Sequence, residues 1–443
     1  MNNLSSTKNA VKNTVFLTSA EVITKFLAFM LTIYIARYLQ EAGFGKYSFA
    51  IAFTSFFSVI SDLGINNLTI REIARNKDFA GKYIGNFSIA KVLFSFIALI
   101  LLYIIINLMN YPSDTKVAVY IFGIYVVVSS FGQFLISVFR AYEKMEYETF
   151  VRVIEKISLV FLVICVIYFK RGLIEIAFSF LLSSSLSFII AYIIIIKKFT
   201  IPQFKIDRKF LKDSIKEALP FGLTFLFGII YFKIDTVMLS LMQGDAVVGW
   251  YNAAYNIIDG LTAVVATSIA NACYPTMSKY YITSKNELKN IFIQSFLILL
   301  ISGFIISCIV TVYSEQFIHL FYGDKYSNSA LSLKILVWAF FVICISNISS
   351  TLLYATNKQR IVTIGTGLGA LINITLNLIL IPRYSLLGAA FATLITELLG
   401  FVIYMYYSLR VLDIRRGDYK YILTDIVQRS RIILKKYFGS RVL

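Results

Sequence analysis

Four cysteines, five prolines, one histidine and a low share of charged residues limit what this 443-residue chain can be. Charged residues make up 15% of the chain, against about 25% in soluble domains, which excludes a soluble globular protein. The cysteines stand singly and His319 is alone, so we expect no disulfide scaffold, no zinc site and no histidine-based triad. No Walker A motif occurs, and nothing in the sequence predicts an enzyme.

Hydrophobic residues are abundant instead. They make up 58% of the chain, and the mean hydropathy is +0.76, which indicates a polytopic membrane protein. A membrane-spanning helix needs about 20 mostly apolar residues. The sequence therefore predicts an all-α fold with about 12 transmembrane helices, at 12–36, 47–66, 83–108, 117–139, 151–169, 173–196, 218–242, 247–274, 289–313, 331–355, 361–381 and 386–409. The first span is expected to be retained, because no signal-peptide cleavage pattern accompanies it.

The basic residues predict the orientation. Most of the 42 lysines and arginines fall in the connections on the side that holds both chain ends. Basic loops face the cytoplasm, so both termini are predicted to be cytoplasmic and the protein is predicted to lie in the plasma (inner) membrane. The net charge of +18 is then explained by topology and by contact with anionic membrane lipids, and no nucleic-acid partner is expected.

A short repeat predicts the domain organisation. GKYSFA at 45–50 recurs as GWYNAA at 249–254, each opening a span. Two halves of six spans share one orientation, so an axis along the membrane normal should relate them, as in transporters with a central cavity between two lobes. The predicted units are an N-terminal lobe, a cytoplasmic amphipathic linker, a C-terminal lobe and a basic cytoplasmic tail, at 1–196, 197–217, 218–409 and 410–443.

Several charged residues lie inside or at the ends of spans. Insertion of a charged side chain near the centre of a membrane-spanning helix costs about 2.5–3.5 kcal/mol. Lys25, Lys91 and Lys233 are predicted to project into one shared cavity, with Lys25 and Lys233 on corresponding spans of the two lobes. For Arg71 and Arg140, which lie near the ends of spans, snorkelling or capping is the favoured explanation, and a place in the cationic cavity is the alternative. The acidic candidates for binding a coupling H⁺ or Na⁺, or for gating, are Glu21, Asp62, Asp235 and Asp259; for Asp62 a structural ion pair is the alternative.

Two stretches resemble a known family. GFGKYSFAIAFTSFFSVISDLGINNLTIREIAR (43–75) and ALPFGLTFLFGIIYFKIDTVMLSLMQGDAVVGWYNAAYNI (218–257) are similar to the signatures of Wzx-type polysaccharide flippases, within the multidrug/oligosaccharidyl-lipid/polysaccharide exporter superfamily. The resemblance implies two six-helix lobes in a V shape and a cationic central cavity. It also implies that Arg71 and Arg140 match basic family positions near the cytoplasmic mouth.

The implied activity is the transfer, by alternating access, of a polyprenyl-(pyro)phosphate-linked oligosaccharide from the cytoplasmic to the outer leaflet for surface polysaccharide or glycan assembly. A glycan polymerase and glycosyltransferases are candidate partners. One alternative is a cation-coupled multidrug exporter of small organic cations on the same fold, which would favour a cavity dominated by acidic residues. A non-transporting scaffold for a glycan polymerase is a third reading, but it leaves the intramembrane lysines unexplained.

Overall fold

The computed structural model describes residues 2–413, with side chains from residue 24 onward, and every regular element in this range is helical. Residues 414–443, most of the predicted tail, lie outside the described range. Short 3₁₀ or π turns at Lys77–Phe79, Ala263–Thr267 and Asp324–Tyr326 join some of the helices. The helices are α1 (Asn2–Asp62), α2 (Ile65–Arg75), α3 (Ala80–Leu108), α4 (Ser113–Ala141), α5 (Met145–Tyr168), α6 (Leu173–Lys198), α7 (Arg208–Gln243), α8 (Asp245–Thr262), α9 (Ser268–Thr283), α10 (Lys285–Val312), α11 (Ser314–Tyr322), α12 (Ser329–Ala355) and α13 (Gln359–Val411).

Nine helices in the described range are long and apolar enough to cross a membrane. Two of them, α1 and α13, contain a residue of positive φ, Gln40 (φ 60°) and Ser385 (φ 52°), where the helix is broken. If the two arms of α1 and the two arms of α13 are each counted as separate spans, the nine helices supply eleven of the twelve predicted spans. The twelfth requires that α5 also cross the membrane. Helix α5 carries three charged residues along its apolar stretch, Arg152, Glu155 and Lys156, so the number twelve stays a prediction.

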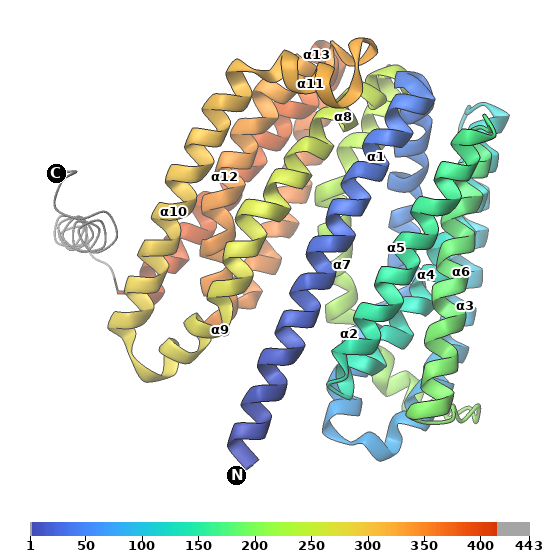
Figure 1. Ribbon diagram of the computed structural model, residues 1–443, viewed down its shortest axis with the longest axis vertical. Coiled ribbons are helices and arrows are strands. Elements are labelled where there is room, and N and C mark those ends of the chain that lie inside the picture. The colour runs from blue at the N-terminus through green and yellow to red at the C-terminus, as the bar shows by residue number, and fades with distance from the viewer. Residues whose placement is uncertain (1, 414–443) are drawn as a thin grey trace.

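The helices form two lobes that meet at one end and diverge toward the end where the N-terminus lies (Figure 1). Helices α2 to α6 lie in one lobe and α8 to α13 in the other, with α7 between them. The start of α7 packs against the first lobe, where Phe210 contacts Tyr83 and Phe87, and its end packs with α13. The two-lobed all-α architecture predicted from the sequence is therefore confirmed.

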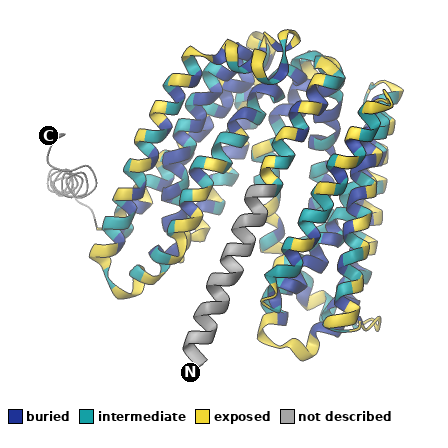
Figure 2. Cartoon of the chain, viewed as in Figure 1, coloured by how far each residue is buried: buried dark blue, intermediate teal, exposed yellow. Residues whose placement is uncertain are grey.

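Exposed residues occur along the outer sides of both lobes (Figure 2), and many of the exposed residues of the described chain are large and apolar. On α3, for example, Val92, Leu93, Phe96 and Ile100 are exposed on one side of the helix. A contiguous apolar surface of this kind is unfavourable in water and favourable in a lipid bilayer. The burial pattern therefore supports a multi-pass membrane protein.

The joined end depends on two glycines, which are the first residues of the repeated motif. A Cβ on Gly45 would lie 1.7 Å from the backbone oxygen of Asp245, and a Cβ on Gly249 would lie 2.0 Å from that of Glu41. Gly45 thus packs against Asp245, four residues before Gly249, and Gly249 packs against Glu41, four residues before Gly45. Such a reciprocal contact is what a twofold relation between two repeats would produce. No larger residue fits at either position while the lobes are closed at this end.

Hydrogen bonds between the N-terminal arm of α1 and residues 320–326 reinforce the same end. Arg37 donates to the backbone oxygens of Phe321, at 2.7 Å, and Leu320. The hydroxyl of Tyr326 donates to the oxygen of Ala36 at 2.7 Å. The lobes are therefore joined by main-chain contacts and hydrogen bonds at this end of the molecule.

The predicted linker 197–217 comprises the end of α6, a non-helical segment at 199–207 and the first turns of α7. The segment lies against α3, since a Cβ on Gly85 would meet the Gln203 oxygen at 1.9 Å. Asp207 caps α7 by accepting from the Phe210 amide at 3.0 Å, and the ammonium of Lys82 donates to it at 2.8 Å. This hydrogen bond from Lys82 holds the pKa of the Asp207 carboxyl below its usual range.

Candidate functional site

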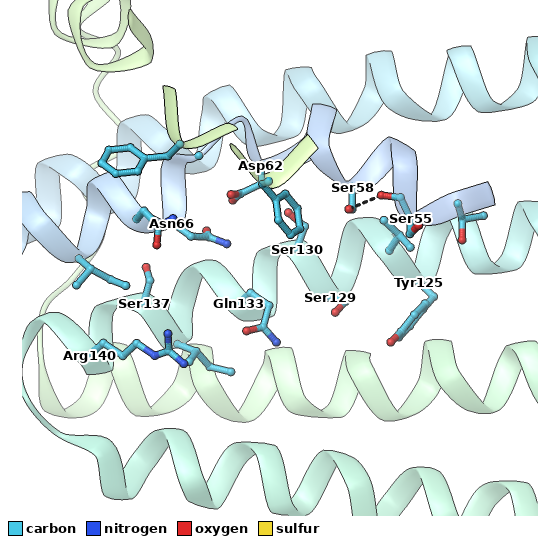
Figure 3. Close-up of a pocket in the computed structure, with 18 of the residues that line it drawn as sticks. Ser55, Ser58, Asp62, Asn66, Tyr125, Ser129, Ser130, Gln133, Ser137 and Arg140 are labelled. Carbon is cyan, nitrogen blue, oxygen red and sulfur yellow. Dashed lines mark hydrogen bonds between the residues drawn. The ribbon is translucent and has the colours of Figure 1, made fainter. Parts of the chain in front are cut away.

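A break between α1 and α2 shapes one end of a cavity in the first lobe. Leu63 (φ 45°) and Gly64 (φ 82°) both adopt the left-handed conformation. A Cβ on Gly64 would lie 2.3 Å from the Ala218 oxygen of α7, so the break is packed closely against α7. The break places Asp62 before it and Asn66 after it on the cavity wall (Figure 3).

The cavity has a volume of about 620 Å³ and lies among α1, α2, α4, α5 and α7. Many of its lining side chains are polar, and hydroxyl and amide groups are frequent among them. Phe221 and Phe225 contribute the α7 wall. The polar lining residues are Thr54, Ser55, Ser58, Asp62, Asn66, Asn67, Tyr125, Ser129, Ser130, Gln133, Ser137, Arg140 and Arg152.

Lys91 does not line this cavity but contacts two residues that do, Asp62 and Ser130. Its side chain is 0% exposed, and its ammonium donates to Asp62 at 2.9 Å, to the Ser130 hydroxyl at 2.8 Å and to the Ser61 oxygen at 3.2 Å. The prediction that three lysines share one cavity therefore needs correction for Lys91. Folding brings an acidic partner from another helix against it, and the ion pair neutralises its charge.

The two arginines that line the cavity share one buried carboxylate. Arg140 donates to both oxygens of Glu148, at 2.8 and 2.6 Å, and Arg152 donates to the same residue at 2.8 Å. Arg152 also donates to the amide oxygen of Gln133 at 2.9 Å. Arg140 thus lies in the cavity wall, as part of an ion-pair network.

Arg71 lies outside the cavity lining. It donates to Glu72 at 2.6 Å and to Glu217, and so connects α2 to the start of α7. Its place in the fold is that of a bridge between two helices. Glu21, the remaining residue of the predicted set near the N-terminus, lies outside the residues whose side chains the structure describes.

A second cluster of charged residues lies on α1, α7 and α8. Lys25 of α1 and Lys233 of α7 both attract the carboxylate of Asp259 on α8. Lys25 and Asp259 are exposed and Lys233 is half-buried. Within the described part of the chain, neither lysine is held in a close ion pair. Among the residues whose side chains the structure describes, two cations and one anion therefore meet in an accessible place, with a positive balance.

Asp235 lies in a buried network inside the second lobe. Its carboxylate accepts from the Tyr251 hydroxyl at 2.8 Å, from Thr393 at 2.7 Å and from the Asn377 amide at 2.5 Å. Asn377 also donates to Asn373 at 2.9 Å. All the described partners of Asp235 are uncharged, so a proton or a cation could compensate its charge.

Sequence reasoning missed most of the polar cavity lining. The signal was present: Tyr125, Ser129, Gln133 and Ser137 follow one another at intervals of four on α4 and so share one helix face. Isolated serines in an apolar span have an ordinary role as donors to their own helix backbone, which hides such a stripe. Only the packing of α4 against α1 shows that the stripe faces a cavity.

The fold, the apolar outer surface and the accessible charged cluster between lobes define a multi-pass membrane transporter. The chain belongs to the polysaccharide biosynthesis protein family, whose model matches residues 10–281. A second model, MatE, matches residues 220–379.

Relatives are similar to the chain over much of its length, and solved structures share its fold. A putative O-antigen transporter of Shigella flexneri is 23% identical over 86% of this chain and 93% of its own length. The uncharacterized membrane protein MJ1068 of Methanocaldococcus jannaschii is 21% identical over 68% of this chain, which spans 61% of that protein. The lipid II flippase MurJ in an inward closed conformation shares the fold with a TM-score of 0.77, at 16% identity, over 96% of this chain and all of that one. An inward-facing multidrug resistance MATE family transporter has a TM-score of 0.68, at 15% identity, over 90% of this chain and 98% of that one.

Proposed function

We propose that the protein is a flippase that moves a polyprenyl-(pyro)phosphate-linked oligosaccharide from the cytoplasmic to the outer leaflet by alternating access. The observation that carries this proposal is the pair Lys25 and Lys233 beside Asp259. The family and the functions of the O-antigen transporter and of the lipid II flippase MurJ support the same class of cargo.

The charge of the pair suits a phosphate. A lipid-linked phosphate loses hydration when it enters a protein interior, and two ammonium groups offset that cost. Lys25 lies on α1 and Lys233 on α7, which starts against one lobe and ends against the other. A rotation of the lobes would therefore separate or join the two cations, and so change the affinity for phosphate during the cycle.

The shape suits entry from the side of the chain termini. The lobes are joined at the end of Gly45 and Gly249 and diverge at the opposite end (Figure 1). If both termini are cytoplasmic, this is an inward-facing state. Cysteine labelling from outside the cell should modify a cysteine placed at Asp324 and spare one placed at Lys205. The opposite pattern would contradict the cytoplasmic entry.

Coupling to H⁺ or Na⁺ would act through the buried Asp235 network. A carboxylate surrounded by neutral donors can change its charge state at a lower cost than one held by a lysine. Asp259, whose carboxylate is attracted by both lysines, is the second acidic candidate. Asp62 is already neutralised by Lys91 and is therefore assigned a structural role.

A cation-coupled multidrug exporter is the second candidate function. The exposed carboxylate of Asp259 and the MATE-like fold favour it, since an organic cation needs an acidic contact. The two lysines that flank Asp259 oppose it, because they repel such a cargo. The flippase therefore accounts for more of the cluster.

The deciding experiment measures leaflet exchange of a fluorescent polyprenyl-pyrophosphate oligosaccharide in proteoliposomes. Lys25→Gln or Lys233→Gln should reduce exchange by about 30-fold or more, equivalent to about 2–5 kcal/mol of lost phosphate binding. Lys25→Arg and Lys233→Arg should keep part of it, because the charge remains. Lys279→Gln, an exposed lysine on α9, is the matched control and should have no effect. Normal exchange by both glutamine variants would overturn the proposal, and transport of organic cations would then favour the exporter.

A further inference from the structure

The cavity of the first lobe has a lining unlike that of a phosphate site. Its hydroxyl and amide groups come from α1, α2 and α4, and the aromatic rings of Phe221 and Phe225 come from α7. Figure 3 shows Ser58, Asp62, Ser129 and Gln133 gathered along the space between α1 and α4. A site of about 620 Å³ is within the range of about 300–1,000 Å³ that small-molecule sites occupy.

The charged side chains of the lining are all held in ion pairs. Asp62 is paired with Lys91, and Arg140 and Arg152 are paired with Glu148. A charged ligand would therefore have to compete with existing ion pairs. A neutral ligand with many hydroxyl groups would not.

Uncharged hydrogen-bonding capacity remains in the lining. The hydroxyl of Ser55 donates to the backbone oxygen of Ala52, and the hydroxyl of Ser58 donates to the backbone oxygen of Ser55, each at 2.6 Å. The hydroxyl oxygens of both serines remain as acceptors. The amide oxygen of Asn66 is buried and has no partner among the described residues. A buried acceptor without a donor is unfavourable, and a ligand hydroxyl would satisfy it.

The position of the cavity along α7 relates it to the lysine pair. Phe225, on the cavity wall, precedes Lys233 by eight residues, which is about 12 Å along an α-helix. The cavity therefore lies about two turns from the proposed phosphate site, toward the start of α7. That separation is suited to two adjoining parts of one cargo molecule.

We propose that this cavity binds uncharged sugar residues of the lipid-linked cargo, next to the phosphate held by Lys25 and Lys233; this inference rests on the proposed function. Hydroxyls of the sugar exchange hydrogen bonds with Ser55, Ser58 and Asn66. The apolar face of a sugar ring packs against an aromatic ring, as aromatic linings of ligand sites allow. The cavity selects neutral sugars over acidic ones.

The test measures binding to the full-length protein in nanodiscs with three probes: undecaprenyl phosphate, the same lipid carrying one glucose, and the same lipid carrying one glucuronic acid. The wild-type protein should bind the glucose lipid about tenfold more tightly than bare undecaprenyl phosphate. Ser55→Ala/Ser58→Ala/Ser129→Ala should lose most of this gain and bind the bare lipid as before. Lys233→Gln should weaken the binding of all three probes.

The matched control removes three serines outside the cavity lining that also donate to their own helix backbone. Ser158→Ala/Ser302→Ala/Ser350→Ala should keep the tenfold gain. A gain that survives in the cavity triple variant, or a preference for glucuronic acid, would overturn the sugar site while leaving the phosphate site intact. Failure of the wild-type protein to bind even the bare lipid would overturn the proposed function, and the sugar site with it.

A second measurement does not depend on the folding of the triple variant. A benzophenone amino acid is placed at Val126, which lines the cavity, or at Ile124, which is exposed on the same helix. On illumination, the Val126 protein should crosslink to the sugar of the glucose lipid, and the Ile124 protein should crosslink to lipid chains only. Equal crosslinking of the sugar at both positions would contradict the sugar site.

Discussion

The two lobes treat a carboxylate inside the membrane-spanning region in different ways. In the first lobe, Asp62 is held by the ammonium of Lys91 at 2.9 Å. In the second lobe, Asp235 accepts three hydrogen bonds from neutral groups of Tyr251, Thr393 and Asn377. Asp62 thus has its counter-charge inside the protein, and Asp235 does not in the described structure.

The difference separates a structural charge from an adjustable one. Removal of one partner of an internal ion pair lowers the free energy of unfolding by several kcal/mol, because the other charge stays inside the protein. A carboxylate with neutral donors can take up a proton or a cation and release it again, which a transport cycle requires. We therefore propose that the Asp62–Lys91 pair stabilises the fold and that Asp235 couples transport to an ion, and the following predictions test this division.

The largest expected loss of stability follows from Lys91→Met. The substitution leaves Asp62 without its cation, and we expect unfolding to become easier by about 3–5 kcal/mol. Thermal unfolding in detergent measures the effect. Lys82→Met is the matched control, since its pair with Asp207 has side chains 36% and 39% exposed and should contribute less than about 1 kcal/mol.

A double variant sharpens this prediction. Lys91→Met/Asp62→Leu removes both charges and should recover most of the stability that Lys91→Met loses. If the double variant is as unstable as the single one, packing rather than charge explains the effect. The contrast between the lobes would then lose its basis in the first lobe.

An intermediate effect is expected at the joined end, where the lobes are alike. Gly45→Ala and Gly249→Ala each introduce a Cβ into the other lobe's backbone, at 1.7 and 2.0 Å. Each should destabilise the closed contact by about 1–3 kcal/mol and shift the lobes apart, as distance measurements between spin labels on α1 and α8 would detect. Gly132→Ala and Gly228→Ala, with nothing within 4 Å, should leave that distance unchanged. A shift from only one of the two glycine variants would contradict the reciprocal contact.

The smallest change in stability is expected for Asp235→Asn. Asparagine keeps the shape and some of the hydrogen bonds, so unfolding should change by about 1 kcal/mol. Leaflet exchange should nevertheless lose its dependence on an H⁺ or Na⁺ gradient. A loss of stability as large as that of Lys91→Met, or unchanged gradient dependence, would show that Asp235 is structural as well.

Local sequence patterns were sufficient for the architecture. The long apolar runs predicted the helices, because a single segment that crosses a bilayer can satisfy all its backbone hydrogen bonds within itself only as an α-helix. The recurrence of GKYSFA as GWYNAA predicted the two lobes, and the structure shows the two motif glycines in reciprocal contact. Charges inside spans marked Lys25, Lys233 and Asp235 as residues that need an explanation.

Partners between distant helices could not be predicted in the same way. Lys91 and Asp62 are 29 residues apart and lie on different helices, and only the packing of α3 against α1 makes them an ion pair. The same holds for Asp235 and Thr393, which are 158 residues apart. A single sequence gives the cost of each intramembrane charge but not the group that compensates it.

The sequence by itself determined that this protein is helical, crosses a membrane and consists of two related lobes, since hydropathy and repetition are properties of the chain. Tertiary structure decided which charges are neutralised, which face one another and where a polar cavity lies. The physical reason is range: helix formation and insertion depend on neighbouring residues, whereas the compensation of a buried charge depends on a partner at about 3 Å, brought there from anywhere in the chain.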